Sequence, residues 1–291
     1  MAFRTVVVDT HSKLEYSLAY LVFRTPDVTK KILLDEIHTL MISSTSVSIT
    51  TGLLNECAKR KIKVIFCDEK HNPSSELSPF YGNSNSSRRI KEQLAWTQES
   101  MATVWQYIIK EKIMNQASFL KETGKIEYAN QLVEFANQVN AGDLTNREGH
   151  AAKVYFNHAF FDGFTRDTPC FINACLDYGY TILLSEFNRA IVSAGYLTQL
   201  GIHHKNDFND FNLSCDFMES FRFVVDRKAS TLKQEDDFKG EMIKLLESEV
   251  VQCGKTQTLA NAINIYCNSI FTALNTGDLT KISFIDYGSG R

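Results

Sequence analysis

Two adjacent histidines and two nearby carboxylates stand out in residues 201–222, which read GIHHKNDFNDFNLSCDFMESFR. His203 and His204 come first, and Asp216 and Glu219 follow, three residues apart from each other. On a helix this spacing places two side chains about 60° apart around the axis, so both acids can face one point. One imidazole with two or three carboxylates and no thiolate suits Mn²⁺ or Mg²⁺, and such sites typically serve phosphoryl transfer.

A further acid, Glu148, lies in the stretch TNREGHAAKVYF, where Thr145 or Asn146 is a capping residue that predicts the start of a helix. Each of these features also has an ordinary structural explanation. A Glu near a helix start commonly serves the helix dipole, and paired acids commonly form a solvated face. The ring nitrogens of a histidine in a loop more commonly form hydrogen bonds than bind a metal. The residue pattern alone therefore leaves a metal site and a purely structural role equally open.

The elements that must position these side chains fall into two parts, and the first is rich in strands. Short stretches with β-branched and aromatic residues alternate with polar turns: RTVVVD, AYLVFR, KKILL, HTLMISS and VSIT. Between Ser48 and Lys61 the apolar residues recur at helical spacing, with Thr50 or Thr51 as the cap. The run IKVIFCDE then predicts a buried strand. Residues 1–75 are therefore expected to form a β-rich N-terminal domain with one helix.

The second part begins after a linker. The stretch NPSSELSPFYGNSNSS holds two of the four prolines of the chain together with Ser, Asn and Gly, and we place the linker at 76–87. Beyond it, only Pro169 interrupts a series of periodic apolar segments. These segments predict helices over 90–120, 126–138, 147–161, 171–199, 216–230, 238–252 and 256–275. The expected fold class is α+β, with a larger all-α catalytic domain at 88–291.

Composition narrows the class of protein. The chain has 291 residues, of which 44% are hydrophobic, enough for one large domain or two modest ones. Seven cysteines without a C-x-x-C pair suit free thiols in a reducing cytoplasm. No apolar run reaches the length of a membrane span, and the first residues lack the features of a signal peptide. The net charge of −3 argues mildly against a non-specific DNA binder and excludes no nucleic-acid partner.

Several motifs together resemble one known family. NREGHAAKVYF, INACLDYGYT, the G-I-H-H turn and FNLSCDFMESFRFVVD follow one another in the order and spacing of the CRISPR-associated spacer integrase, the universal adaptation subunit. The chain is most similar to the type II branch of that family. The similarity runs from RTVVVDTHSK to about residue 230. Agreement of several motifs is far more specific than any one of them.

The resemblance implies a homodimer that forms through the N-terminal domain, and a metal site in the helical domain. Its ligands would be Glu148, His204 and Glu219, with His203 as the alternative imidazole and Asp216 as a second acid of less certain role. Other positions match motif residues and would contact DNA or support the ligands, although each also fits helix packing or capping: Asn146, Arg147, Tyr155, Asn173, Tyr178 and Arg222. Lys205, next to the histidines, is a further expected phosphate contact.

The activity that the resemblance implies is the insertion of prespacer DNA into a CRISPR array. A 3′-OH of a short DNA duplex attacks a phosphodiester at the leader–repeat junction, with Mg²⁺ or Mn²⁺ as cofactor. The implied partners are double-stranded DNA, a small ferredoxin-like subunit, and, in type II systems, the RNA-guided nuclease and a DNA-end-binding ring protein. Two alternatives stay open here: a DNA-binding scaffold without chemistry, and a metal-dependent hydrolase of small phosphodiesters.

Overall fold

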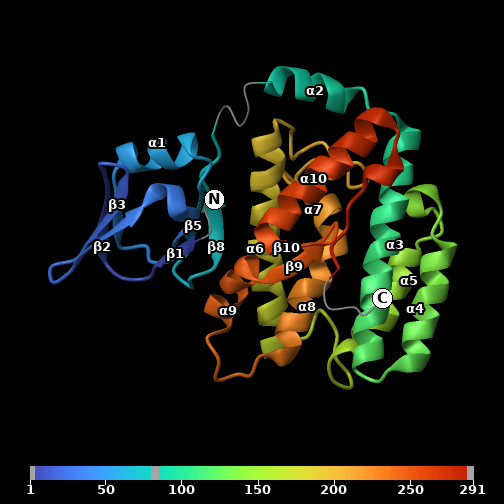
Figure 1. Ribbon diagram of the computed structural model, residues 1–291. Coiled ribbons are helices and arrows are strands. Elements are labelled where there is room, and N and C mark those ends of the chain that lie inside the picture. The colour runs from blue at the N-terminus through green and yellow to red at the C-terminus, as the bar shows by residue number, and fades with distance from the viewer. Residues whose placement is uncertain (1–3, 80–84, 287–291) are drawn as a thin grey trace. The chain divides into compact units, whose positions relative to one another are not determined.

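The computed structural model describes residues 4–79 and 85–286, and the chain divides into two compact units, Met1–Ser84 and Asn85–Arg291 (Figure 1). In the described part of the first unit, two four-stranded sheets are present. One sheet has the order β1-β5-β7-β8, from Arg4–Val8, Ile37–Ile42, Lys63–Cys67 and Pro73–Glu76. The other has the order β4-β3-β2-β6, from Thr29–Leu33, Tyr20–Arg24, Ser12–Ser17 and Val47–Ile49.

Helix α1 (Thr51–Lys59) begins where the sequence predicts it, because the Thr50 side chain accepts a hydrogen bond from the backbone N–H of Leu53. Leu53 and Cys57 of this helix are fully buried in a core with strand residues such as Leu40. The β-rich N-terminal prediction is thus confirmed. Strand β2 was not predicted, because SKLEYS is mostly polar and lacks β-branched residues.

The expected linker 76–87 overlaps regular structure at both of its ends. Glu76 is the last residue of β8, and residues 86 and 87 open helix α2. Residues 80–84 of the expected linker lie outside the described residues. Proline fits β8 because Pro73 is its first residue and β8 is an edge strand, where a missing N–H costs no ladder hydrogen bond.

The second unit is mainly helical (Figure 1). Its helices are α2 (Ser86–Leu94), α3 (Gln98–Glu122), α4 (Ile126–Gln138), α5 (Arg147–Ala159), α6 (Phe171–Ala194), α7 (Asn212–Met218), α8 (Arg222–Thr231), α9 (Phe238–Lys244) and α10 (Leu259–Thr276). Short 3-10 turns include η3 (Glu219–Phe221), between α7 and α8. Helices α3, α4 and α5 contact one another, and α6 packs against α7, α8 and α10. None of the helices in the described residues is both long and apolar enough to cross a membrane.

Several details differ from the predicted helices. The predicted helix over 90–120 is two helices, α2 and α3, which are separated at residues 95–97, where the Thr97 side chain caps the start of α3. The prediction of a helix over 238–252 is wrong at its end, since Glu249–Gln252 is strand β9, which pairs antiparallel with β10 (Lys255–Thr258). Positive φ at Cys253 and Gly254 closes that hairpin. The predicted helix 216–230 is broken at η3, so Asp216 and Glu219 do not share one regular helical face. Phe217, Phe221 and Val224 are fully buried and anchor these short helices in the core.

Candidate active site

Glu148 lies in the first turn of α5, whose start is held by two side chains. The Asp143 carboxylate accepts hydrogen bonds from the backbone N–H groups of Arg147 and Glu148, both at 2.9 Å. Asn146 caps the same turn by accepting the N–H of Gly149 at 3.1 Å. A Cβ at Gly149 would come within 2.7 Å of the Asn146 side-chain oxygen, so a larger residue would push the cap away. Asp143, Asn146 and Gly149 together therefore fix where α5 starts and where Glu148 lies.

Glu219 opens the turn η3, and its side chain is only 5% exposed. Its Oε1 accepts a hydrogen bond from Nε of Arg222 at 2.8 Å, and its Oε2 lies 2.6 Å from Nζ of Lys112. Asn115 of α3 donates to the backbone carbonyl of Ser220, which ties η3 to α3. Burial alone would raise the pKa of Glu219. The charges of Arg222 and Lys112 outweigh burial, so this pKa lies below its ordinary value.

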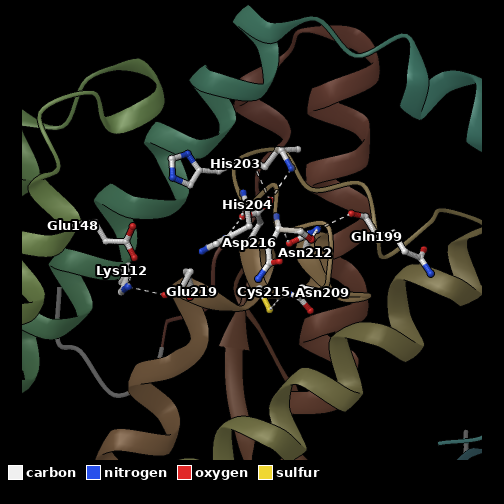
Figure 2. Close-up of polar contacts among 12 residues, drawn as sticks. Lys112, Glu148, Gln199, His203, His204, Asn209, Asn212, Cys215, Asp216 and Glu219 are labelled. Carbon is white, nitrogen blue, oxygen red and sulfur yellow. Dashed lines mark hydrogen bonds and ion pairs between the residues drawn. The ribbon is translucent and has the colours of Figure 1, made fainter. Parts of the chain in front are cut away.

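Lys112 of α3 joins the two acids (Figure 2). Its Nζ donates to Oε1 of Glu148 at 2.5 Å and lies 2.6 Å from Oε2 of Glu219. Burial would lower the pKa of Lys112, but the negative charges of Glu219 and Glu148 raise it above its ordinary value. Carboxylates from α5 and η3 thus converge on one cation, and that cation belongs to the protein.

Asp216 is fully buried and organises the G-I-H-H turn. Its Oδ2 accepts the backbone N–H groups of Ile202 at 2.6 Å and His203 at 2.9 Å. Its Oδ1 accepts the backbone N–H of His204 at 3.1 Å and lies 2.5 Å from the imidazole Nδ1 of the same residue. Because a carboxylate only accepts, Nδ1 of His204 carries the proton, and Nε2 of the neutral ring has a lone pair. A Cβ at Gly201 would come within 2.7 Å of Oδ2, so this close turn requires glycine.

The two neighbouring histidines have different surroundings. The His203 ring stacks on the Trp105 indole, with ring centroids 4.1 Å apart and an interplanar angle of 5°, and its partial burial lowers its pKa. His204 meets the same indole edge-on. The hydrogen bond to Asp216 raises the pKa of His204 against the effect of burial, and the charges of Asp216, Glu219 and Glu148 add to this. His204 therefore lies in the field of both acids with its ring orientation fixed.

Within residues 4–79 and 85–286, no three His, Cys, Asp or Glu side chains lie close enough to hold one ion. The expected set of Glu148, His204 and Glu219 is therefore not closed around a common point, because the Lys112 ammonium stands between the two acids. Asp216, the expected second acid, has both oxygens engaged by the turn. It acts here as the group that orients the imidazole.

The residues nevertheless fit a hard divalent cation. Two carboxylates already surround a positive charge, and the nearby imidazole has its Nδ1 proton held by a carboxylate, leaving Nε2 for a ligand bond. A carboxylate behind a ligating histidine is the usual arrangement at metal centres. Glu148, His204 and Glu219 are thus the residues that could hold Mg²⁺ or Mn²⁺, after a shift of the Lys112 side chain.

Three of the other expected residues support the fold around the site. Tyr155 is fully buried and donates to Oδ2 of Asp226 at 2.8 Å. Asn173 is buried and donates to the backbone carbonyls of Thr165 and Thr168, which holds the loop between α5 and α6 in place. Tyr178 is buried and packs edge-on against the ring of Phe238. Their positions fit support of the ligand-bearing helices.

The remaining expected residues either bind Glu219 or have an exposed or half-buried side chain. Arg222 binds Glu219, and its guanidinium lies over the Tyr180 ring. Asn146 and Lys205 are exposed, and Arg147 is half-buried. A cavity bounded by His204 and Lys205 opens beside the turn, with amide side chains around it that include Gln98, Gln199 and Asn209. Room for a substrate therefore exists next to the candidate ligand.

Sequence reasoning missed Lys112, Trp105 and Asp226. A signal for Lys112 was available in WQYIIKEKI, because Lys112 follows the apolar residues Trp105, Ile108 and Ile109 at helical spacing. A polar residue on a buried helix face usually has a buried partner. Nothing local pointed to Asp226 or Trp105, whose partners are distant in sequence.

Comparisons with known proteins point to one family. The family model of CRISPR associated protein Cas1 matches residues 5–252. The chain is 29% identical over 252 residues to the CRISPR-associated endonuclease Cas1 of Neisseria meningitidis serogroup C, covering 87% of this chain and 83% of that protein.

Two solved structures resemble the fold. A casposase bound to integration product has a TM-score of 0.76 at 17% identity, covering 95% of this chain and 92% of the casposase. A Cas6-RT-Cas1–Cas2 complex has a TM-score of 0.72 at 21% identity, covering 96% of this chain and 36% of the matched chain. At these identities the structural similarity concerns the fold alone.

Proposed function

Because the chain belongs to the Cas1 family of CRISPR-associated proteins, we propose that it is a metal-dependent integrase and endonuclease that inserts prespacer DNA into a CRISPR array. One observation carries the proposal. Glu148 and Glu219, from separate elements, converge on a single positive charge beside His204, whose ring is oriented by Asp216. The relative named an endonuclease and the casposase bound to integration product support DNA as the substrate.

The proposed reaction is a transesterification. The 3′-hydroxyl oxygen of the prespacer bonds to a phosphorus of the repeat strand, and the bond from that phosphorus to its 3′ oxygen breaks. The hydroxyl loses its proton and the leaving oxygen gains one, so the number of phosphodiester bonds is unchanged. The reaction needs no covalent enzyme intermediate, and the site accordingly needs no serine or tyrosine nucleophile.

The protein's own groups have separate tasks in this reaction. Glu148, His204 and Glu219 would hold Mg²⁺ or Mn²⁺, and the ion supplies electrostatic stabilisation of the reacting phosphate and a lowered pKa of the attacking hydroxyl. Asp216 keeps the proton of His204 on Nδ1 and the turn in place. Lys205 and Arg147, at the edges of the site, would contact DNA phosphates and set the position of the strand.

The assembly is part of the same proposal. We expect a homodimer that binds prespacer and repeat duplexes in the cytoplasm and acts with a small ferredoxin-like subunit. A Cas1–Cas2 complex among the structural neighbours supports a small Cas partner. The similarity to the Neisseria relative agrees with a type II system, in which the RNA-guided nuclease and a DNA-end-binding ring protein would also take part.

A strand-transfer assay tests the activity. Full-length protein is incubated with prespacer duplex, a plasmid carrying a leader and repeat, and Mn²⁺, with and without chelator. The proposal predicts joined products that require the ion and that disappear in Glu219→Ala and His204→Ala proteins. Circular dichroism confirms that each variant is folded.

His150→Ala is the matched control, because His150 is an exposed histidine on α5 outside the site. It should keep normal strand transfer. Normal products from His204→Ala would overturn the proposal. DNA binding that persists in chelator without any joined product would instead indicate a scaffold, and turnover of a small chromogenic phosphodiester without DNA joining would indicate a general hydrolase.

A further inference from the structure

Lys112 occupies an unusual position for a lysine. It lies on α3 between the fully buried residues Ile109 and Ile113, and its side chain is only 11% exposed. Lysines are rarely this buried unless they are paired. The two partners come from other parts of the chain, Glu148 on α5 and Glu219 on η3. A single flexible side chain therefore links three elements at the candidate metal position.

The charges of this cluster balance without any metal. Glu148 and Glu219 contribute two negative charges, and Lys112 and Arg222 contribute two positive charges. Two carboxylates this close to one ammonium would repel each other in its absence, since Glu219 is buried where water screens little. Lys112 thus supplies, in the metal-free protein, the positive charge that the two acids need.

Both oxygens of Glu219 are already engaged, Oε1 by Arg222 and Oε2 by Lys112. An entering ion must therefore displace one of these two cations from the carboxylate. Arg222 is the better anchored of the two, because its guanidinium also lies 4.6 Å from the centre of the Tyr180 ring. Lys112 has four rotatable side-chain bonds and reaches both acids, so it occupies the shared position that an ion would take.

We propose that Lys112 is an internal cation that holds Glu148 and Glu219 together in the metal-free protein and competes with the divalent ion for them. This inference rests on the proposed metal site. Metal entry would release the ammonium from Glu219 towards the more exposed Glu148, whose side chain is 24% exposed. The cluster would then change from neutral to a net charge of +2, which favours a DNA phosphate at the site only after the ion has entered.

Competition predicts that removing the ammonium strengthens metal binding. Calorimetry with Mn²⁺ alone, on full-length wild-type and Lys112→Met proteins, should give a dissociation constant at least about tenfold lower for the variant, because the buried ion pair between Lys112 and Glu219 no longer has to be broken. Lys112→Gln, which keeps a polar side chain, should shift in the same direction and serves if the methionine variant does not fold.

Thermal unfolding gives a second readout that does not depend on activity. Without metal, Lys112→Met should unfold at a lower temperature than wild type, because its two acids have lost a counter-charge. Saturating Mn²⁺ should remove most of that difference. Lys110→Met is the control, since Lys110 is exposed on the same helix two residues earlier, and it should leave both measurements unchanged.

The possible results separate the inference from the proposed site. Unchanged or weaker Mn²⁺ binding by Lys112→Met, with binding by wild type, would show that Lys112 does not compete and would overturn the inference alone. Absence of Mn²⁺ binding by the wild-type protein would overturn the metal site and the inference with it.

Discussion

Two clusters around buried acids lie in the same helical unit and shift the pKa of a carboxyl group in opposite directions. At the candidate metal position, Glu219 is surrounded by cations and its pKa lies below the ordinary value. At the second cluster, Asp226 is 1% exposed and accepts hydrogen bonds from the hydroxyls of Tyr155 and Tyr180. Burial there raises the pKa of Asp226 to about 6, although both tyrosine hydroxyls lower it.

The same helices carry both clusters. Helix α5 contributes Glu148 to one and Tyr155 to the other, and α8 contributes Arg222 and Asp226 one turn apart. A balanced set of charges that is partly exposed at Glu148 is available for a cation, whereas the closed, hydrogen-bonded Asp226 holds the supporting helices together. Loss of an acid from the first cluster should therefore affect activity more than stability, and changes in the second cluster should affect mainly stability.

The largest expected effect is on strand transfer by Glu148→Ala. Loss of one proposed ligand should lower the rate at least about 100-fold. The free energy of unfolding should change by less than about 1 kcal/mol, because Lys112 keeps Glu219 as a partner and Glu148 is partly exposed. Rates of product formation and urea unfolding measure the two quantities.

Glu127→Ala provides the matched control, because Glu127 is an exposed acid in the first turn of α4. It should leave both quantities unchanged. A large stability loss in Glu148→Ala with normal strand transfer would reverse the roles that we assign to the two clusters.

The second effect concerns pH. The pKa of Asp226 is about 6 in the folded protein and 3.8 as its ordinary value, so the folded state binds the proton more tightly. The free energy of unfolding should therefore fall as pH rises from about 4 to 6, by up to about 3 kcal/mol from this group. Asp226→Asn lacks this titration. Urea unfolding of the wild-type and Asp226→Asn proteins between pH 4.5 and 7 measures this pH dependence. If the two free energies of unfolding differ by the same amount at every pH, the raised pKa is contradicted.

A smaller effect is expected from Tyr155→Phe. The substitution removes the hydroxyl that donates to Oδ2 of Asp226 at 2.8 Å. The free energy of unfolding should therefore fall by about 1–2 kcal/mol. Strand transfer by the folded protein should stay within a few-fold of wild type. Tyr107→Phe, at an exposed tyrosine of α3, is the control. Equal stability of the two variants would show that the buried hydrogen bond contributes nothing.

The smallest effect concerns Asp216 and His204. Replacing Asp216 with Asn removes the charge that raises the pKa of His204, so that pKa should fall. Because a metal binds the neutral imidazole, the pH range over which Mn²⁺ affinity rises should move to lower pH in the variant. NMR titration of the His204 ring resonances measures the first change and Mn²⁺ titration the second. A pKa that is unchanged would contradict the assigned role of Asp216.

The contrast between the clusters also shows what the sequence could predict. Motif positions in R-E-G-H, G-I-H-H and D-x-x-E mark residues whose geometry depends on local caps and turns, and these were found. Strands and helices with clear periodicity were found as well, including α4 at its observed limits. Lys112 and Asp226 depend on contacts between α3, α5, α6 and α8, which no local pattern encodes. The short hairpin β9–β10 was missed although Cys253 and Gly254 form its turn.

The proposed activity requires that Glu148, His204 and Glu219 bind one divalent cation. Pulsed EPR of Mn²⁺ bound to the full chain tests it directly, because a ligating imidazole nitrogen couples to the electron spin of the ion. We expect a nitrogen coupling in the wild-type protein that is lost in His204→Ala and retained in His203→Ala. A bound ion without nitrogen coupling, or a coupling that disappears with His203 instead, would contradict it.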